Sequence, residues 1–341
     1  MSPTSHRFPG LAGRLRLACN AVGVTLLFLV MGLAAQDAKP SHLTWGSPTI
    51  LENLWSAAEL RGESPKNLLG KNCPPGPAKP QIVLAPLPAP WHHSIRKVNP
   101  VKNRKVAALT FDLCEGAQEV SGYDAGVVNY LRSQRVKATF FAGGKWMRSH
   151  PEQTLHLMAD PLFEVGNHSW SHRNFRGLSR AAMEDQIQRT QAQYESLRQE
   201  LARRVQAKSL DLRELEKIPR APLTFRFPYG ACNAEALRLT AQLGLPAIQW
   251  DVVTGDPDRR QTAEKIARVI LSKIQPGSII IGHANGRGVW TADALPLVVP
   301  KLRDLGYELV TVSELLQCGP AVSSPDCYTR KAGTLVWATL K

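Results

Sequence analysis

The residues of this chain best suited to chemistry are two histidines four positions apart, His168 and His172. They directly follow an apolar run at residues 162–166. If the segment forms a helical turn, side chains at positions i and i+4 project from one face and can bind a single divalent metal ion. Two ordinary histidines of the surface or the core can share this spacing, so the pair is only half of a metal site.

Other polar residues stand where further apolar runs end. Asp112 follows the run at 106–111, Arg226 opens the segment Arg-Phe-Pro-Tyr-Gly, Asp256 follows the run at 247–250, and His283 follows the run at 278–281. In a parallel sheet the carboxyl ends of the strands meet at one rim, where active residues gather. Two metal-binding histidines with a carboxylate, an arginine and a further histidine are the inventory of metal-assisted hydrolysis.

The elements that must position these residues alternate along the chain. Short apolar runs separated by amphipathic segments predict an α/β fold with a parallel sheet, either open or closed into a barrel. Residues 179–215, rich in Gln, Glu, Arg and Leu, predict a long polar helix or helical hairpin inserted on the outside. We expect strands at 106–111, 138–141, 163–166, 247–250, 278–281 and 308–311, and helices at 125–134, 262–273 and 292–305.

Five segments in order resemble a known family. They are Thr-Phe-Asp at 110–112, the histidine segment 168–172, Arg-Phe-Pro-Tyr-Gly at 226–230, the region of Asp256, and Ile-Gly-His at 281–283. Together they resemble the polysaccharide deacetylases, also known as NodB-homology proteins or carbohydrate esterase family 4, over residues 106 to 316. The resemblance implies a distorted (β/α) barrel that removes N- or O-acetyl groups from glycans with one divalent metal, zinc or cobalt.

The resemblance also implies roles for single residues. Asp112 would be the general base that takes a proton from the attacking water, and Arg226 would orient it and keep it ionised through a charge-assisted pair. The backbone N–H of Tyr229 would stabilise the oxyanion. Ile281 and Trp250 would line the substrate pocket.

His283 would be the general acid that protonates the departing amine. A neighbouring carboxylate would raise the pKa of its imidazolium and so keep the acid charged. Asp256 fits that partner best, with Asp251 and Asp258 as alternatives.

One departure from the family concerns the metal. The family has two adjacent aspartates in its first motif, the second of which binds the metal, but here Leu113 follows Asp112. Glu115 is the expected third protein ligand, and Cys114 or water are the alternatives. A bridge between Cys114 and Cys232 is a further hypothesis, against two ordinary thiols.

Residues 1–35 predict an export signal or a membrane anchor. Arginines precede an apolar stretch at 17–35, and Gly-Leu-Ala at 32–34 resembles a cleavage site. Residues 36–100 form a Pro-rich arm, 101–320 the catalytic domain with the insertion 179–215, and 321–341 a C-terminal tail. Export permits disulfides, and Cys318 and Cys327 are close enough in sequence to close a small loop.

The composition limits the partners. The chain has 341 residues and a formal net charge of +14, which favours anionic partners. Because the chain is expected to be periplasmic or secreted, we expect an acetylated cell-wall or extracellular glycan and no nucleic acid, with a membrane contact only if the first segment stays uncleaved. An amidase for a non-sugar substrate and a catalytically inactive carbohydrate-binding protein are the alternatives.

Overall fold

The computed structural model describes residues 45–63, 68–69 and 76–328. The expected signal or anchor at residues 1–35, together with Cys19 and Cys73, lies outside this part. Within the described residues, every helix is too short or too polar to cross a membrane.

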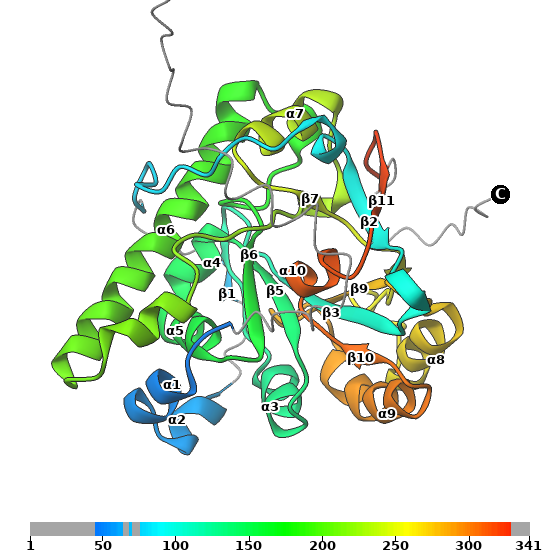
Figure 1. The fold of residues 1–341 in the computed structure, drawn as a ribbon, viewed down its shortest axis with the longest axis horizontal. Coiled ribbons are helices and arrows are strands. Elements are labelled where there is room, and N and C mark those ends of the chain that lie inside the picture. Colours follow the sequence, from blue (N-terminus) through cyan, green and yellow to red (C-terminus); the bar gives the residue numbers. More distant parts are fainter. Residues whose placement is uncertain (1–44, 64–67, 70–75, 329–341) are drawn as a thin grey trace, which may run out of the picture. The chain divides into compact units, whose positions relative to one another are not determined.

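A ring of parallel strands forms the centre of the fold (Figure 1). Strand β3 (Val106–Leu113) pairs in parallel with β5 (Ala138–Ala142) on one side and with β9 (Ile279–His283) on the other. Beyond these lie β6 (Phe163–Asn167) and β8 (Val252–Val253). Every residue of β3 is buried, as is typical of parallel strands that are covered on both faces.

Single bridges close the ring. Phe225 pairs in parallel with Asn167 of β6 and with Ala247 of β7 (Ala247–Ile248), and β7 runs on into β8. The sheet therefore returns to its starting strand, which confirms the distorted (β/α) barrel that the resemblance implied. Strand β2 (Ser94–Val98) pairs with β7, and β10 (Glu308–Leu309) pairs with the start of β3.

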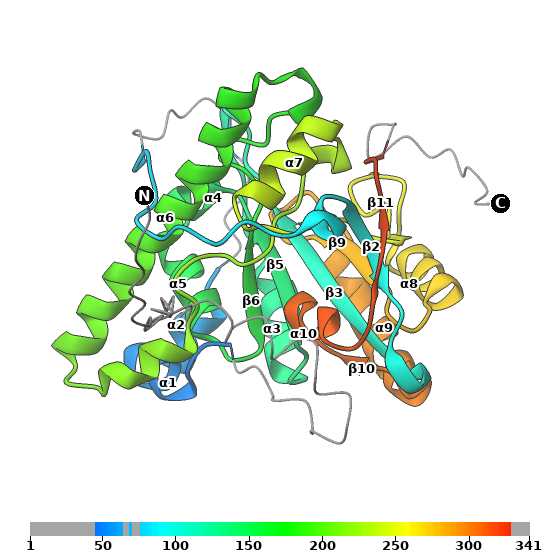
Figure 2. The same ribbon diagram turned by 45° about the horizontal axis from the view of Figure 1, so that its top comes forward.

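Helices surround the ring, and several begin at the caps that their sequences predict (Figure 2). The side chains of Asp124, Ser179 and Thr262 each accept a hydrogen bond from the first turn that follows them. The helices are α3 (Ala125–Ser133), α4 (Gly144–Ser149), α5 (Pro151–Ala159), α6 (Arg180–Ala207), α7 (Ala234–Gln242), α8 (Ala263–Lys273) and α9 (Thr291–Asp304). Short 3₁₀ turns cover Ala89–Trp91, Val101–Asn103, Phe175–Gly177, Leu212–Lys217 and Pro228–Gly230.

The interior of the barrel is filled rather than hollow. Helix α10 (Val312–Leu316) places Val312 and Leu315 in a buried cluster with side chains of β3, β5 and β9. The N–H of Val312 donates to Thr139 Oγ1 of β5, which fixes the helix against the strands. The free rim of the barrel is therefore the one where β3, β6 and β9 end, which is where the polar residues are.

The long polar segment is more closely integrated than its composition indicates. Helix α6 packs against α4, α5, α7 and β6. Its buried face holds Met183, Ile187 and Leu201, and it also buries Gln186 and Gln191. These amides donate to or accept from the backbone and side chains of the barrel, so polar composition here does not mean a solvated helix.

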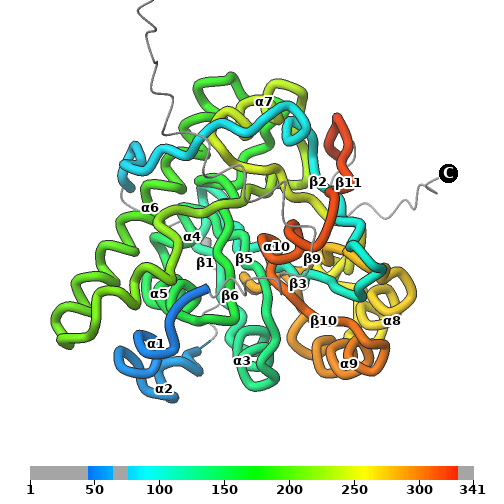
Figure 3. The backbone as a smooth tube through the Cα atoms, in the orientation of Figure 1, coloured from blue at the N-terminus to red at the C-terminus, as the bar shows by residue number. Residues whose placement is uncertain are grey.

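Parts of the Pro-rich arm and of the tail are also ordered against the barrel. The prolines of the arm favour an irregular segment with limited structure, in which residues 51–58 could form a short helix. Helices α1 (Pro48–Leu54) and α2 (Ala57–Arg61) lie in the arm, and α1 contributes Ile50 and Leu51 to the main core. Figure 3 shows this part, in blue, beside α5 and α3. In the tail, β11 (Ala321–Ser324) pairs with β2. In the arm, β1 (Leu68–Leu69) pairs with β4 (Glu119–Val120).

Candidate active site

The histidine segment forms a tight loop after β6 and not the helical turn that the spacing suggested. Ser169 and His172 both have positive φ, at 64° and 52°, and the N–H of Ser169 donates to Asn167 Oδ1 (2.9 Å), which stabilises the turn. The loop still brings the two imidazoles together, with ring centroids 5.1 Å apart. The predicted pairing of His168 with His172 is therefore present, although its local structure was predicted wrongly.

One nitrogen of His168 is fixed and the other is unused. Nδ1 lies 2.9 Å from the carbonyl oxygen of Arg226, which can only accept, so Nδ1 carries the proton. Nε2 has no hydrogen-bond partner in the described part of the chain, although His168 is 1% exposed. Burial lowers the pKa of His168 and holds that of His172 well below its ordinary value, so both rings are neutral at neutral pH. A neutral, oriented imidazole with a free lone pair is the form that binds metal.

The third group beside the two histidines is Cys114. The sulfur and one nitrogen of each ring all lie within 4.8 Å of one another, and this is the group of potential metal ligands that the described residues offer. Leu113 cannot take part, because its side chain is fully buried in the core between the strands and the helices.

Glu115, the expected third ligand, points elsewhere. Its carboxylate accepts from the N–H of Ser121 (3.0 Å) and the hydroxyl of Ser149 (2.7 Å), and it lies 3.6 Å from the ammonium of Lys145. Lys145 in turn donates to main-chain carbonyls of the 116–119 loop. Glu115 thus stabilises the loop after β3 from its far side, and the prediction that it binds metal is not supported.

Asp112 and Arg226 form a buried pair on the rim. Arg226 is fully buried and donates from Nη1 to Asp112 Oδ1 (2.9 Å) and to Thr110 Oγ1 (2.8 Å). The remaining guanidinium N–H groups donate to the carbonyls of Ile248 and Gln249. Asp112 Oδ2 is left facing His168 Nε2 at 3.4 Å. The arginine orients one carboxylate oxygen, and the other oxygen is directed at the pair of histidines.

His283 and Asp256 form the second pair. Nδ1 of His283 lies 3.0 Å from Asp256 Oδ1, and the N–H of His283 donates to Oδ2 (2.7 Å). Burial opposes the charge of both groups, but their mutual attraction raises the pKa of His283 and lowers that of Asp256. The alternatives lie elsewhere, since Asp251 accepts from Ser278, and the half-buried Asp258 accepts from the exposed Arg260.

The two pairs are direct neighbours in the barrel. Asp112 and His283 are register partners on β3 and β9, so their side chains point to the same face of adjacent strands. Thr254 and Thr291 complete the second pair by donating to Asp256 (2.9 and 2.8 Å). The sequence analysis singled out neither threonine. Thr254 lies two positions before Asp256, and Thr291 begins α9, the helix that follows β9.

Tyr229 lies beside the histidines. Its ring centroid is 4.4 Å from that of His172. Its backbone has a φ of 60°, a conformation that residues other than glycine rarely adopt. The tyrosine is 40% exposed. The strained turn turns the residue toward the rim, as a backbone donor at the site requires.

Ile281 and Trp250 are placed differently from the expectation. They are 5% and 4% exposed and belong to the interior cluster with Val312 and Leu315. Tyr328 stacks on Trp250 with centroids 5.0 Å apart and so covers it. Trp250 therefore supports the barrel wall behind Arg226, and the prediction that it lines an open pocket is not supported.

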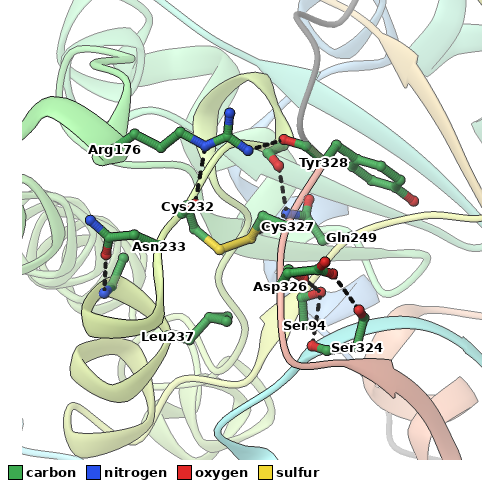
Figure 4. The surroundings of a disulfide bond; sticks show 12 residues. Ser94, Arg176, Cys232, Asn233, Leu237, Gln249, Ser324, Asp326, Cys327 and Tyr328 are labelled. Carbon is green, nitrogen blue, oxygen red and sulfur yellow. Dashed lines mark hydrogen bonds between the residues drawn. A yellow bond between two sulfur atoms is a disulfide. The ribbon is translucent and has the colours of Figure 1, made fainter.

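A disulfide ties the tail to this wall (Figure 4). It joins Cys232 to Cys327, and Cys114 and Cys318 are free thiols. The bridge considered between Cys114 and Cys232, and the loop that Cys318 and Cys327 could have closed, are thus not formed; Cys114 is a free buried thiol, as the alternative held, whereas Cys232 is bridged. The bridge lies next to the site loop, because the N–H of Tyr328 donates to the carbonyl of Gly230 (3.0 Å). Pairing across 95 positions depends on the tertiary fold and could not be deduced from local spacing.

Known proteins resemble this chain over the same region. The model of the polysaccharide deacetylase family matches residues 99–248. A peptidoglycan-N-acetylglucosamine deacetylase of Listeria monocytogenes is 29% identical over 248 residues, 71% of this chain and 47% of that protein. A peptidoglycan-N-acetylmuramic acid deacetylase of Bacillus subtilis is 33% identical over 214 residues, 62% of this chain and 39% of that protein. Residues 99–248 of this chain thus match the polysaccharide deacetylase family.

The chain spans less than half the length of these two relatives. Among solved structures, a carbohydrate esterase family 4 pseudoenzyme from Bacillus anthracis is 26% identical with a TM-score of 0.53, covering 65% of this chain and 68% of that one. A mutant of that pseudoenzyme, with restored enzymatic activity, matches at 27% identity and the same TM-score. A match to this family therefore does not by itself establish activity, and the argument for activity rests on the site residues.

Proposed function

We propose that this chain is an exported, metal-dependent deacetylase of acetylated glycans, with cell-wall or extracellular polysaccharide as its substrate. The observation that supports this most strongly is the adjacency of two differently tuned pairs, Asp112 with Arg226 and His283 with Asp256, on neighbouring strands beside two neutral histidines. A protein that only binds sugar has no need of a base and an acid.

The residues of the rim suit a divalent metal ion. The donor set includes two neutral imidazoles, and the buried Nε2 of His168 has no other partner among the described residues. A bound ion would supply Lewis acidity, which polarises the acetyl carbonyl and acidifies water. His168 and His172 would hold it, and zinc or cobalt suits nitrogen ligands of this kind.

The base and the acid follow from the hydrogen bonds. Asp112 Oδ1 is occupied by Arg226, so Oδ2 is the oxygen free to take a proton from the attacking water. His283 donates Nδ1–H to Asp256, which leaves Nε2 to give a proton to the departing amine. The charge of Asp256 keeps the imidazolium available at neutral pH. The N–H of Tyr229 is the donor for the oxyanion.

Two features support export. The apolar stretch at residues 17–35 follows arginines and precedes Asp37, as in an export signal or an anchor. The disulfide between Cys232 and Cys327 needs an oxidising compartment. A fusion of residues 1–40 to a reporter that is active only after export tests this, and a reporter that stays inactive would contradict it.

The activity is tested on the purified full chain after it has been loaded with zinc or cobalt. We expect acetate release from acetylated chito-oligosaccharides or peptidoglycan fragments, and loss of both metal and activity in the His168→Ala, His172→Ala double variant. Release from a small non-sugar amide alone would favour an amidase. Binding of the oligosaccharide without release of acetate would favour an inactive carbohydrate-binding protein. This outcome is worth testing because Leu113 replaces a metal-binding aspartate and because one similar solved structure is a pseudoenzyme.

A further inference from the structure

We propose that Cys114 binds the metal through its sulfur as a thiolate. The site would then be Cys-His-His and would select thiophilic ions, such as zinc, cobalt and cadmium, over magnesium, calcium and manganese. This inference rests on the metal dependence of the proposed function and names the ligand that the family's missing aspartate leaves open.

The alternation of β3 explains why position 114 reaches the rim. Successive side chains of a strand point to opposite faces. Thr110 and Asp112 both accept from Arg226 inside the barrel, whereas Leu113 lies in the outer core. Cys114 follows Asp112 by two positions and returns to its face, while Glu115 points outward to Lys145.

The rim offers a thiol where a ligand is needed. The sulfur of Cys114 and the nitrogens of His168 and His172 lie within 4.8 Å of one another. Nε2 of His168 is an independent sign of a missing partner. It makes no hydrogen bond among the described residues and faces the carboxylate oxygen Oδ2 of Asp112 at 3.4 Å, and a buried ring nitrogen without a hydrogen bond is costly unless something binds to it. Cys114 is itself 2% exposed, so it is shielded from chance ligands.

A supporting hydrogen bond holds the sulfur. Asn285, which is fully buried, donates from Nδ2 to Cys114 Sγ (3.1 Å) and to the carbonyl oxygen of Cys114 (2.6 Å). Hydrogen bonds to a ligand atom fix its direction and stabilise its charge, and metal sites commonly carry such outer partners. The same contact also ties the end of β3 to the loop after β9. The candidate acid, His283, is the last residue of β9.

The chemistry of sulfur determines the class of ion. Soft thiolate ligands favour zinc and related ions, and hard oxygen ligands favour magnesium, calcium and manganese. A single thiolate with two neutral imidazoles also supplies one negative charge, as the family's aspartate would. The substitution of ligand type therefore keeps the charge of the site and changes its preference among metals.

Cobalt reports the ligand directly. The metal-stripped full chain is titrated with Co²⁺, and we expect a sulfur-to-cobalt charge-transfer band in the near ultraviolet at one equivalent. Cys114→Ser should lose the band and bind zinc about 100-fold more weakly or worse, beyond the roughly 10–100-fold loss that removal of an outer hydrogen bond causes. Cys114→Asp should bind cobalt without the band and accept manganese more readily.

The matched control is Cys318→Ser, because Cys318 is the other free buried thiol of the described residues and donates to Glu314. It should keep the band and the affinity. A band that persists in Cys114→Ser, or an unchanged zinc affinity there, would overturn the inference. Activity that survives complete metal removal, with an acetylated Cys114 trapped by mass spectrometry, would also overturn it by making the sulfur a nucleophile.

The spectrum separates this inference from the proposed function. A chain that shows the band but releases acetate from no glycan keeps the thiolate ligand and loses the proposed function. If the wild-type chain deacetylates glycans but Cys114→Ser has the same cobalt spectrum as the wild type, the proposed function stands and Cys114 is not a ligand.

Discussion

Replacement of Asp256 by Asn tests how the candidate acid is charged. The substitution keeps the shape of the side chain and one acceptor oxygen, but it removes the negative charge 3.0 Å from His283 Nδ1. The hydroxyls of Thr254 and Thr291 remain to hold the amide in place. Because a carboxylate partner raises the pKa of an imidazolium, its loss should lower that of His283.

The size of the effect can be bounded from the distance. Two unit charges 3.0 Å apart interact by about 5.5 kcal/mol at an effective dielectric constant of about 20. Burial of the ring acts in the opposite direction, so this Coulomb energy is an upper bound on the stabilisation that the imidazolium loses. We expect the pKa of His283 to fall in Asp256→Asn.

The assay is the pH profile of kcat/KM for acetate release from an acetylated chito-oligosaccharide. The alkaline limb, where His283 loses its proton, should move to lower pH. Asp258→Asn is the matched control, because it removes a carboxylate two positions away that is paired with Arg260 and not with His283, and its limb should not move. If the limb of Asp256→Asn coincides with the wild type, His283 is not charged through Asp256 and the assignment of the acid is refuted.

Three further results are expected. Asp112→Asn should keep its metal, as metal analysis of the purified variant would show, yet lose turnover by about 100-fold or more; a fully active variant would place the base elsewhere. Glu115→Gln should keep the cobalt spectrum but lose about 1–3 kcal/mol of stability in denaturant unfolding, since Lys145 loses its buried partner; a changed spectrum with intact stability would restore Glu115 as a ligand. Cys327→Ser should cost about 2–4 kcal/mol in the same unfolding measurement, and an unchanged midpoint would show that the bridge does not hold the tail.

The sequence predicted parallel strands alternating with helices because that signal is local and repeated, whereas the closed barrel was implied only by the family resemblance. The apolar run at 106–111 and the later runs all became strands of the ring or its extensions, and the amphipathic segments between them became helices. Closure through Phe225 has no such signal, because it depends on a single bridged residue on each side. The sequence allowed a short helix at residues 51–58 of the arm, where α1 and α2 lie. Its packing was not predictable for a related reason, since Ile50 and Leu51 contact a core that no local pattern reveals.

The two pairs of the site were readable because each residue ends a strand or begins the loop after it. Cys114 and Asn285 were harder, although Cys114 follows Asp112 by two positions and Asn285 follows His283 by two positions. Reading alternation past the end of each strand would have favoured Cys114 over Glu115. Glu115 was favoured because a bridge to Cys232 would have occupied Cys114, and the disulfide of Cys232 with Cys327 removes that reason. The carboxylate of Glu115 is turned to Ser149 and Lys145 instead.

The arrangement on β3 separates proton transfer from metal binding. Asp112 is held by Arg226 from inside the barrel, and Cys114 is held by Asn285 from the loop after β9, so neither depends on the side chain of the other for its position. A change of ligand at the end of the strand therefore leaves the base and its arginine in place. If this chain proves inactive, we expect the cause to be weak or altered metal binding. The pH profile of any residual activity would still report the pair of His283 and Asp256.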